Sequence, residues 1–198
     1  MDTKLTGKTR IESDLIGARE IPAEALYGVQ TLRGIENFSI SKFRLSEYPL
    51  FIKGLAITKM AAAMANFELG LLTVEQKDAI IAACGEILDG KHHDQFPVDM
   101  IQGGAGTTTN MNANEVIANR ALELMGHERG EYQYCSPNDH VNCSQSTNDA
   151  YPTAIHIGMY FKHLQLLPHL EELIASFRKK GEEFSQIIKM GRTQLEDA

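Results

Sequence analysis

The chain has 198 residues, of which 43% are apolar and 23% are charged, and its net charge is 19 − 26 = −7. This balance is typical of one soluble globular domain, or one and part of a second, and argues against a disordered chain. The acidic excess argues against nucleic acid as a partner, because binding phosphates requires a basic face. The three cysteines form no C-x-x-C pair, which favours reduced thiols in a cytoplasmic protein.

Neither a leader nor a membrane span is indicated. Met1 to Arg10 is polar and lacks the apolar stretch of a secretory signal. The most apolar stretch, Leu50 to Leu72, carries Lys53, Lys59 and Glu68, which a membrane interior would not tolerate. We therefore expect a soluble cytoplasmic protein.

The start of the chain predicts a small hairpin and a short helix. Arg10 to Asp14 and Gly17 to Ile21 are short extended segments on either side of a two-residue turn, and Pro22 ends the second. The short helix is expected around Val29 to Phe38.

Two helices with clear boundaries follow. After Pro49, apolar residues recur at spacings of three and four until Gly70, which predicts an amphipathic helix. Thr73 and Gln76 form a capping box that starts the next helix, and Gly90 lies where a helix end favours a residue that tolerates positive φ.

Two further helices are expected in the second half. Asn112 or Asn114 would cap one that runs to Gly126. Tyr151 to Lys189 reads as a long helix, with Pro168 expected to kink it or mark a new start. Its apolar stripe needs partner helices from missing sequence or from other subunits; the stripe is Leu166, Leu170, Leu173, Phe177, Phe184 and Ile188.

Two loops, Val98 to Asn110 and Cys135 to Asp149, combine small residues with many hydroxyl and carboxamide groups, and each leads into a helix. Glycines let a backbone approach a ligand closely, and a helix N-terminus favours negative charge. These loops therefore indicate a small anion site, although a tight turn and ordinary N-capping are the simpler alternatives. Pro152 is expected in the first turn of the second helix.

The seven histidines do not indicate a metal site. His92 and His93 are adjacent and would not face one another on a helix, and His127-Glu128 lacks a second histidine at H-E-x-x-H spacing. No nucleophile elbow and no Cys–His arrangement is present. We expect neither a metal nor a cofactor.

Five segments together resemble the aspartase/fumarase superfamily, in order and over nearly the whole chain: Gly17–Pro22, Ala25–Thr31, Gln102–Asn119, Val141–Thr153 and Gly191–Ala198. The resemblance implies a mainly α fold. An N-terminal helical domain with a small β-hairpin would cover residues 1–140, and the first long helices of a central helical bundle would cover 141–198.

Within the superfamily the chain is most similar to the aspartate ammonia-lyases. Fumarases usually have a Gln-Ser pair after the residues that match Gly106 and Thr107, Ser-Ser-Asn-Asp in place of Ser146–Asp149, and His in place of Gln194. A class II fumarate hydratase is therefore the alternative enzyme. A non-catalytic helical assembly fragment is the alternative from another class.

The resemblance implies reversible elimination of ammonia from L-aspartate to give fumarate, through an aci-carboxylate dianion and without a metal or organic cofactor. Such an intermediate requires preorganised donors where the negative charge grows. The family's substrate-binding residues match six positions of this chain: Thr107, Ser146, Thr147, Asn148, Thr193 and Gln194.

The family's general base is a serine on a Gly-Ser-Ser-x-Met-Pro loop, and this chain contains no Gly-Ser-Ser and no Met-Pro. We therefore expect no catalytic base in this chain and no lyase activity from it alone. The resemblance also implies a homotetramer in which each active site combines segments of three subunits.

Overall fold

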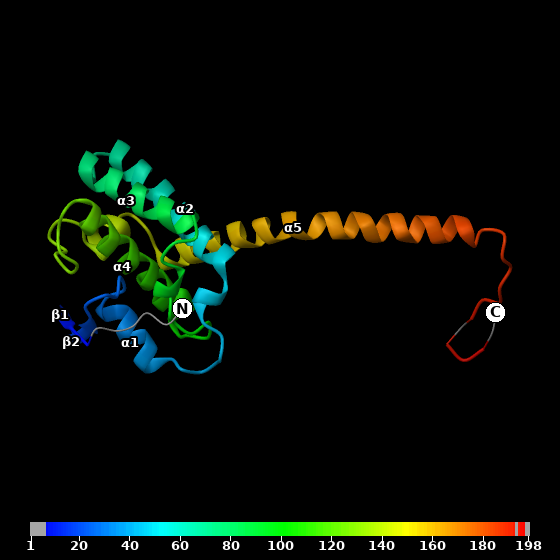
Figure 1. Ribbon diagram of the computed structural model, residues 1–198, viewed down its shortest axis with the longest axis horizontal. Helices are drawn as coiled ribbons and strands as arrows, with labels where there is room; N and C mark the ends of the chain where they lie inside the picture. Colours follow the sequence, from blue (N-terminus) through cyan, green and yellow to red (C-terminus); the bar gives the residue numbers. More distant parts are fainter. Residues whose placement is uncertain (1–6, 193, 197–198) are drawn as a thin grey trace. The chain divides into compact units, whose positions relative to one another are not determined.

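The structure is a computed structural model that describes residues 7–192 and 194–196 (Figure 1). The described residues are mainly α-helical and include one two-stranded antiparallel sheet, which confirms the expected fold class. The chain divides into two compact units, Met1–Met159 and Tyr160–Ala198. The division expected after residue 140 stays a prediction.

The hairpin forms as predicted from strands β1 (Thr9–Asp14) and β2 (Gly17–Pro22). At its turn, an oxygen of Asp14 accepts two backbone N–H groups. Both oxygens of the same carboxylate accept from the guanidinium of Arg33, each at 2.8 Å. Arg33 lies on helix α1 (Val29–Asn37), so a bidentate ion pair fixes the hairpin to this helix.

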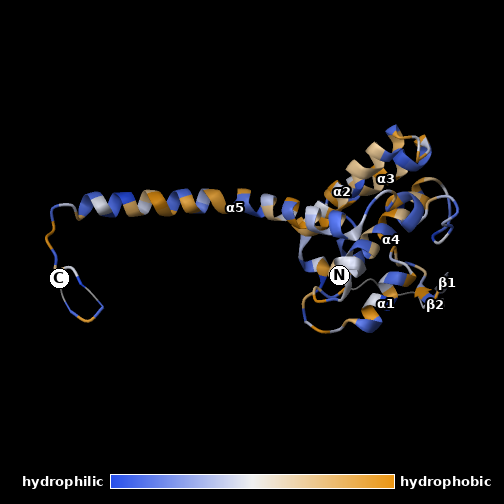
Figure 2. Cartoon of the chain, turned by 180° about the vertical axis from the view of Figure 1, so that it is seen from behind, coloured by the Kyte–Doolittle hydropathy of each residue, from blue (hydrophilic) through white to orange (hydrophobic). Residues whose placement is uncertain are grey.

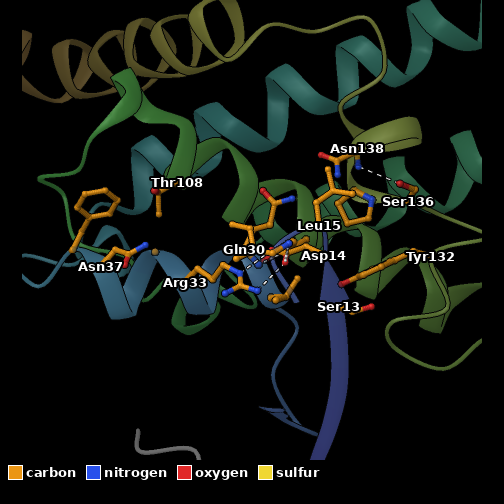
Figure 3. Close-up of a pocket in the computed structure, with 16 residues that line it drawn as sticks. Ser13, Asp14, Leu15, Gln30, Arg33, Asn37, Thr108, Tyr132, Ser136 and Asn138 are labelled. Carbon is orange, nitrogen blue, oxygen red and sulfur yellow. Dashed lines mark hydrogen bonds and ion pairs between the residues drawn. The ribbon is translucent and has the colours of Figure 1, made fainter. Parts of the chain in front are cut away.

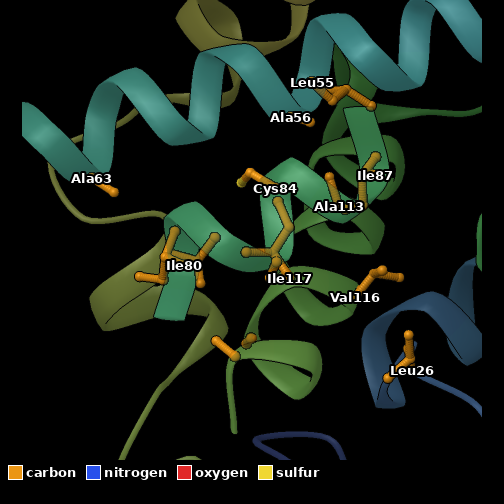
Figure 4. Packing of buried hydrophobic residues seen from close by; sticks show 14 of the residues in the cluster. Leu26, Leu55, Ala56, Ala63, Ile80, Cys84, Ile87, Ala113, Val116 and Ile117 are labelled. Atoms are coloured by element: carbon orange, nitrogen blue, oxygen red, sulfur yellow. The ribbon is translucent and has the colours of Figure 1, made fainter. Parts of the chain in front are cut away.

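Helices α2 (Pro49–Glu68) and α3 (Val74–Leu88) also form as predicted and pack against each other. The Thr73–Gln76 capping box is present, and Gly90 has a φ of +91°. Figure 4 shows side chains of both helices meeting those of a third helix in the core. Although α2 is long and apolar enough to cross a membrane, it packs here in a protein core.

In the part of the chain that the structure describes, three 3-10 turns join the helices: η1 (Leu45–Glu47), η2 (His93–Gln95) and η3 (Gly104–Gly106). A single turn of π-helix, η4 (Pro137–Val141), lies inside the segment that the sequence predicts as a loop. The hydroxyl of Ser136 caps it by accepting two backbone N–H groups.

The core is centred on helix α4 (Thr107–Leu124), which packs against α1, α2 and α3. Every residue from Thr109 to Asn119 is buried, including Asn110, Asn112 and Asn114. The predicted cap was wrong: the helix begins at Thr107, and Asn112 and Asn114 lie inside it. Gly106 occupies the N-cap position, and because glycine has no side chain, this helix has no side-chain cap.

Helix α5 (Thr147–Glu183) begins in the first unit and ends in the second. It starts earlier than predicted, so Pro152 is its sixth residue and lies beyond the first turn. It also continues through Pro168, so of the two expected outcomes, a kink or a new start, the new start does not occur. In the first unit, α5 packs so closely on α2 that position 54 has no room for a side chain. A Cβ on Gly54 would lie 2.2 Å from the carbonyl oxygen of Ala154.

Within the second unit, apolar and polar residues alternate along α5 (Figure 2). Its large apolar side chains are exposed; they include Leu166, Leu170, Leu173 and Phe177. The helix ends at Glu183, before the predicted Lys189, so Phe184 and Ile188 of the predicted stripe lie beyond it and are also exposed. Single helices gain most of their stability from packing an apolar face. The expectation that other helices cover this stripe stays a prediction.

Candidate anion site at two helix N-termini

The N-terminus of α4 is formed by three successive residues with positive φ: Gly104 (+73°), Ala105 (+51°) and Gly106 (+96°). A Cβ on Gly106 would lie 2.4 Å from ring carbons of Tyr151, so only glycine fits here without displacing that ring. Burial against this backbone raises the pKa of the Tyr151 phenol. Gly106 thus allows a close approach between the start of α4 and the segment that carries Tyr151.

A glutamine upstream of the helix closes the first turn of α4. The side-chain oxygen of Gln102 accepts the backbone N–H of Thr109 at 2.8 Å, and its amide donates to the Thr109 hydroxyl at 2.7 Å. The hydroxyl of Thr107 donates to the carbonyl of Gly104 at 2.7 Å. Residues 107–110 are therefore helical, and the predicted loop from Val98 ends at Gly106.

Ser146 begins helix α5 as an N-cap. Its carbonyl accepts the N–H groups of Asp149 and Ala150, and its hydroxyl accepts the N–H of Asn148 at 3.2 Å. One residue is enough for this cap. Thr147 and Asn148 are therefore polar residues beyond what capping requires, as the sequence indicates.

The two helix N-termini lie side by side. The side-chain amide of Asn110, in the first turns of α4, donates to the Thr147 hydroxyl at 3.1 Å. The contact between Gly106 and Tyr151 joins the same two helices. Each helix N-terminus carries a partial positive charge, so the pair forms a surface that favours an anion.

A buried lysine lies under this junction. Lys59 of α2 is fully buried, and its ammonium donates to the side-chain oxygens of Asn142 and Gln145, each at 2.9 Å. The oxygen of Asn142 also accepts from the amides of Asn110 and Asn114. Burial lowers the pKa of Lys59 to about 7. The sequence does place Lys59 on the apolar stripe of α2, which could have indicated a buried cation.

The structure brings four of the six predicted site residues to this junction. Thr147 is half-buried, whereas the other three are exposed: Thr107, Ser146 and Asn148. Gln194 is exposed in the second unit, which the structure describes by itself. Thr193 lies outside the described residues.

A separate cavity of about 750 Å³ lies beside helix α1 (Figure 3). Its lining includes Thr108, the neighbour of Thr107, but none of the four predicted residues at the helix junction. Asp14 and Arg33 point toward one another along its wall. The hydrogen bond from Arg33 lowers the pKa of Asp14 to about 2, so both groups are charged. Because this pair neutralises itself, the cavity offers weaker attraction for a dianion than the helix junction.

Two carboxylates hold the N-terminus of α1. Glu115 of α4 accepts the backbone N–H groups of Gly28, Gln30 and Thr31, at 2.8 to 3.0 Å. Glu12 accepts the intervening N–H of Val29. A Cβ on Gly28 would lie within 2.8 Å of both carboxylates. This helix N-terminus is thus already occupied by the protein's own anions, which the sequence alone did not reveal.

Among the described residues, no group of three or more His, Cys, Asp or Glu side chains could hold a metal ion.

Comparisons with known proteins agree with the resemblance found in the sequence. The model of the family described as Lyase matches residues 17–198. The aspartate ammonia-lyase of Pseudomonas canavaninivorans is 59% identical over 189 residues, which cover 96% of this chain and 40% of the relative. That of Escherichia coli K12 is 56% identical over 195 residues, which cover 98% and 41%.

Solved structures show the same fold. The fumarate lyase:delta crystallin of Brucella melitensis in native form gives a TM-score of 0.89 at 53% identity, covering 96% of this chain and 44% of that one. The class II fumarase of Schistosoma mansoni gives a TM-score of 0.87 at 38% identity, and the match covers 96% of this chain and 40% of the fumarase chain. The chain spans about 40% of the length of the curated relatives. Because the family model matches most of its residues, the chain belongs to the Lyase family.

Proposed function

We propose that this chain forms the N-terminal, substrate-binding part of a carbon–nitrogen lyase that eliminates ammonia from L-aspartate to give fumarate. The observation that carries the proposal is the junction of two helix N-termini, where Asn110 of α4 bonds to Thr147 of α5. The 56% and 59% identities to aspartate ammonia-lyases favour aspartate as the substrate. The chain's acidic balance and cysteine pattern favour a cytoplasmic location.

The reaction places negative charge where the junction can stabilise it. A base removes a proton from C3, and the electrons spread into the adjacent carboxylate as an aci-carboxylate dianion. The double bond between C2 and C3 then forms as the C2–N bond breaks, and ammonia leaves with that electron pair. Hydroxyl and N–H donors of Ser146 and Thr147 would bind the carboxylate as its charge grows. The hydroxyl of Thr107 would join them by exchanging its bond to the Gly104 carbonyl for one to the carboxylate.

The rest of the pocket follows the family pattern. Asn148, Thr193 and Gln194 would line the side near the substrate's amino group. The general base would be a serine from a segment that this chain lacks, and each site would combine segments of three subunits in a homotetramer. The domain division after residue 140 belongs to the same proposal.

The test is to fuse residues 1–198 to the remaining part of the E. coli relative and to measure fumarate by its ultraviolet absorbance. We expect fumarate from L-aspartate, none from L-malate, and none from the 198-residue chain alone. A folded, oligomeric fusion that releases no fumarate from aspartate would contradict the proposal. Fumarate release from L-malate and not from L-aspartate would instead identify the activity as that of a fumarase.

A fumarase is the second candidate, because the class II fumarase of S. mansoni has the same fold. Its lower identity, 38% against 56% and 59%, makes it the weaker one. A non-catalytic assembly role is favoured only by the exposed apolar side chains of α5. Sedimentation of the chain with and without fumarate separates an enzyme from a non-catalytic assembly fragment. A substrate site predicts that fumarate stabilises the associated chain, whereas an assembly fragment should associate equally without it.

A further inference from the structure

Lys59 is buried in surroundings that disfavour its charge. It lies on the core face of α2 between Leu55 and Ala63, and its side chain is fully buried. Within the described part of the chain, no carboxylate pairs with it; its neighbour Cys84 is a thiol whose pKa burial raises to about 12. Burying an ammonium without a counter-charge is costly, so a lysine at this position needs a reason that packing does not give.

The hydrogen bonds of Lys59 all lead to one turn. Its two acceptors, Asn142 Oδ1 and Gln145 Oε1, lie in the segment between η4 and α5, more than eighty residues away in the sequence. The amine keeps two N–H groups when it is neutral, so both bonds persist on either side of pH 7. Lys59 therefore connects the core helix α2 directly to the residues that precede α5.

The turn is also closed internally. The amide of Asn142 donates to the carbonyl of Gln145, and the amide of Gln145 donates to the carbonyls of Val141 and Cys143. Ser144 between them has a φ of +57°, a conformation that a non-glycine residue adopts only when its surroundings impose it. Lys59 holds the two carboxamides on either side of this strained residue.

The same bonds reach the anion site. Asn142 Oδ1 accepts from Lys59 and from Asn110, and Asn110 donates in turn to the Thr147 hydroxyl. Gln145 directly precedes the cap residue Ser146. We propose that Lys59 is a positioning residue, which fixes the 142–145 turn so that Ser146 and Thr147 face the N-terminus of α4. The identity of the ligand rests on the proposed function, whereas the positioning of the turn rests only on the hydrogen bonds described above.

The first experiment measures the turn without any activity. Lys59→Met removes the amine and keeps the volume, and Lys53→Met changes a half-buried lysine of the same helix as a control. We expect the backbone amides of residues 144–149 to exchange hydrogen about tenfold faster in Lys59→Met and at the original rate in Lys53→Met. The denaturant midpoint of Lys59→Met should not fall, because a buried charge has been removed.

A purely structural lysine gives the opposite result: a lower midpoint and no selective change in residues 144–149. Equal exchange in Lys59→Met and the original chain overturns the proposal, and so does the same acceleration in Lys53→Met. If Lys59→Met does not fold, Gln145→Met is compared with Gln145→Glu. Both lose the amide donors of the turn, and only Gln145→Met also loses the acceptor for Lys59. Faster exchange in Gln145→Met than in Gln145→Glu supports the proposal, and equal exchange overturns it.

The second experiment uses the fusion to the E. coli relative. A misplaced carboxylate site should raise the KM for L-aspartate about tenfold in Lys59→Met, the effect of losing one good hydrogen bond, with a smaller change in kcat. An unchanged KM alongside faster exchange limits the role to the turn and contradicts positioning of the site. An inactive fusion that keeps the exchange difference counts against the proposed lyase and not against the role of Lys59 in the turn.

Discussion

Helices α3 and α4 lie against each other in the core, yet they are held there in different ways. Helix α3 buries an apolar stripe and exposes the opposite face, and its start is set by the Thr73–Gln76 capping box. Helix α4 is buried almost all round and carries polar residues inside the core. Apolar contact is non-directional, whereas hydrogen bonds fix relative positions.

The polar residues of α4 hold several different segments. Asn112 donates to the carbonyl of Gln95, Asn119 donates to that of Leu26, and Glu115 accepts three N–H groups at the start of α1. Asn110 reaches α5. Helix α3 therefore contributes stability, whereas α4 also fixes the segments around it and, through Asn110, the start of α5.

The largest effect is expected in the apolar core. Ile80→Ala on α3 removes a fully buried side chain and should lower the free energy of unfolding by about 4 kcal/mol. Urea denaturation measures the loss, with Val74→Ala as the exposed control on the same helix. A loss below about 1 kcal/mol would mean that the core collapses around the missing side chain.

The next prediction concerns the buried lysine. Burial lowers the pKa of Lys59 from 10.5 to about 7, so the unfolded chain binds more protons between these values. The folded state should therefore gain stability as the pH rises, by about 3 kcal/mol between pH 7 and 9.5.

The comparison with Lys59→Met isolates this contribution, because the other titrating groups are shared by both proteins. Denaturation at the two pH values should show a smaller rise in Lys59→Met. Equal rises in both proteins would contradict a depressed Lys59 pKa.

A smaller effect is expected where α4 meets α5. Gly106→Ala combines a positive φ with a collision on the ring of Tyr151, and should cost about 2 kcal/mol or more. Gly126→Ala, also at positive φ but in open space, should cost about 1 kcal/mol. Thermal denaturation measures both losses of unfolding free energy. Equal losses in the two variants would show that the contact between Gly106 and Tyr151 contributes nothing to stability.

The smallest effects separate stability from function. Thr73→Ala and Ser146→Ala each remove an N-cap, and each should cost about 1 kcal/mol of unfolding free energy. In the fusion enzyme, only Ser146→Ala should also raise the KM for L-aspartate. A similar KM in both variants would remove Ser146 from the proposed substrate site.

The sequence predicted those elements whose signals are local. The hairpin, α2 and α3 follow from turn residues, periodicity and caps within a few positions. The start of α4 was missed because threonine and asparagine are weak helix formers and suggest a loop. Its first turn depends on Gln102 and on the packing of Gly106 against Tyr151, which the fold supplies.

The site was only partly predictable for the same reason. Ser146 and Thr147 stand out because a single cap does not need so many polar residues. The link from Lys59 to Asn142 joins residues that are distant in the sequence, and neither residue alone indicates the other. The six substrate-binding assignments came from the resemblance and stay predictions.

The exposed second half of α5 has a practical consequence for handling the chain. Beyond Met159 nearly every described residue of the helix is exposed. A protease should therefore cut there first and leave residues up to about Met159 intact. That trimmed product would be the better sample for crystallisation and for spectroscopy of the helix junction.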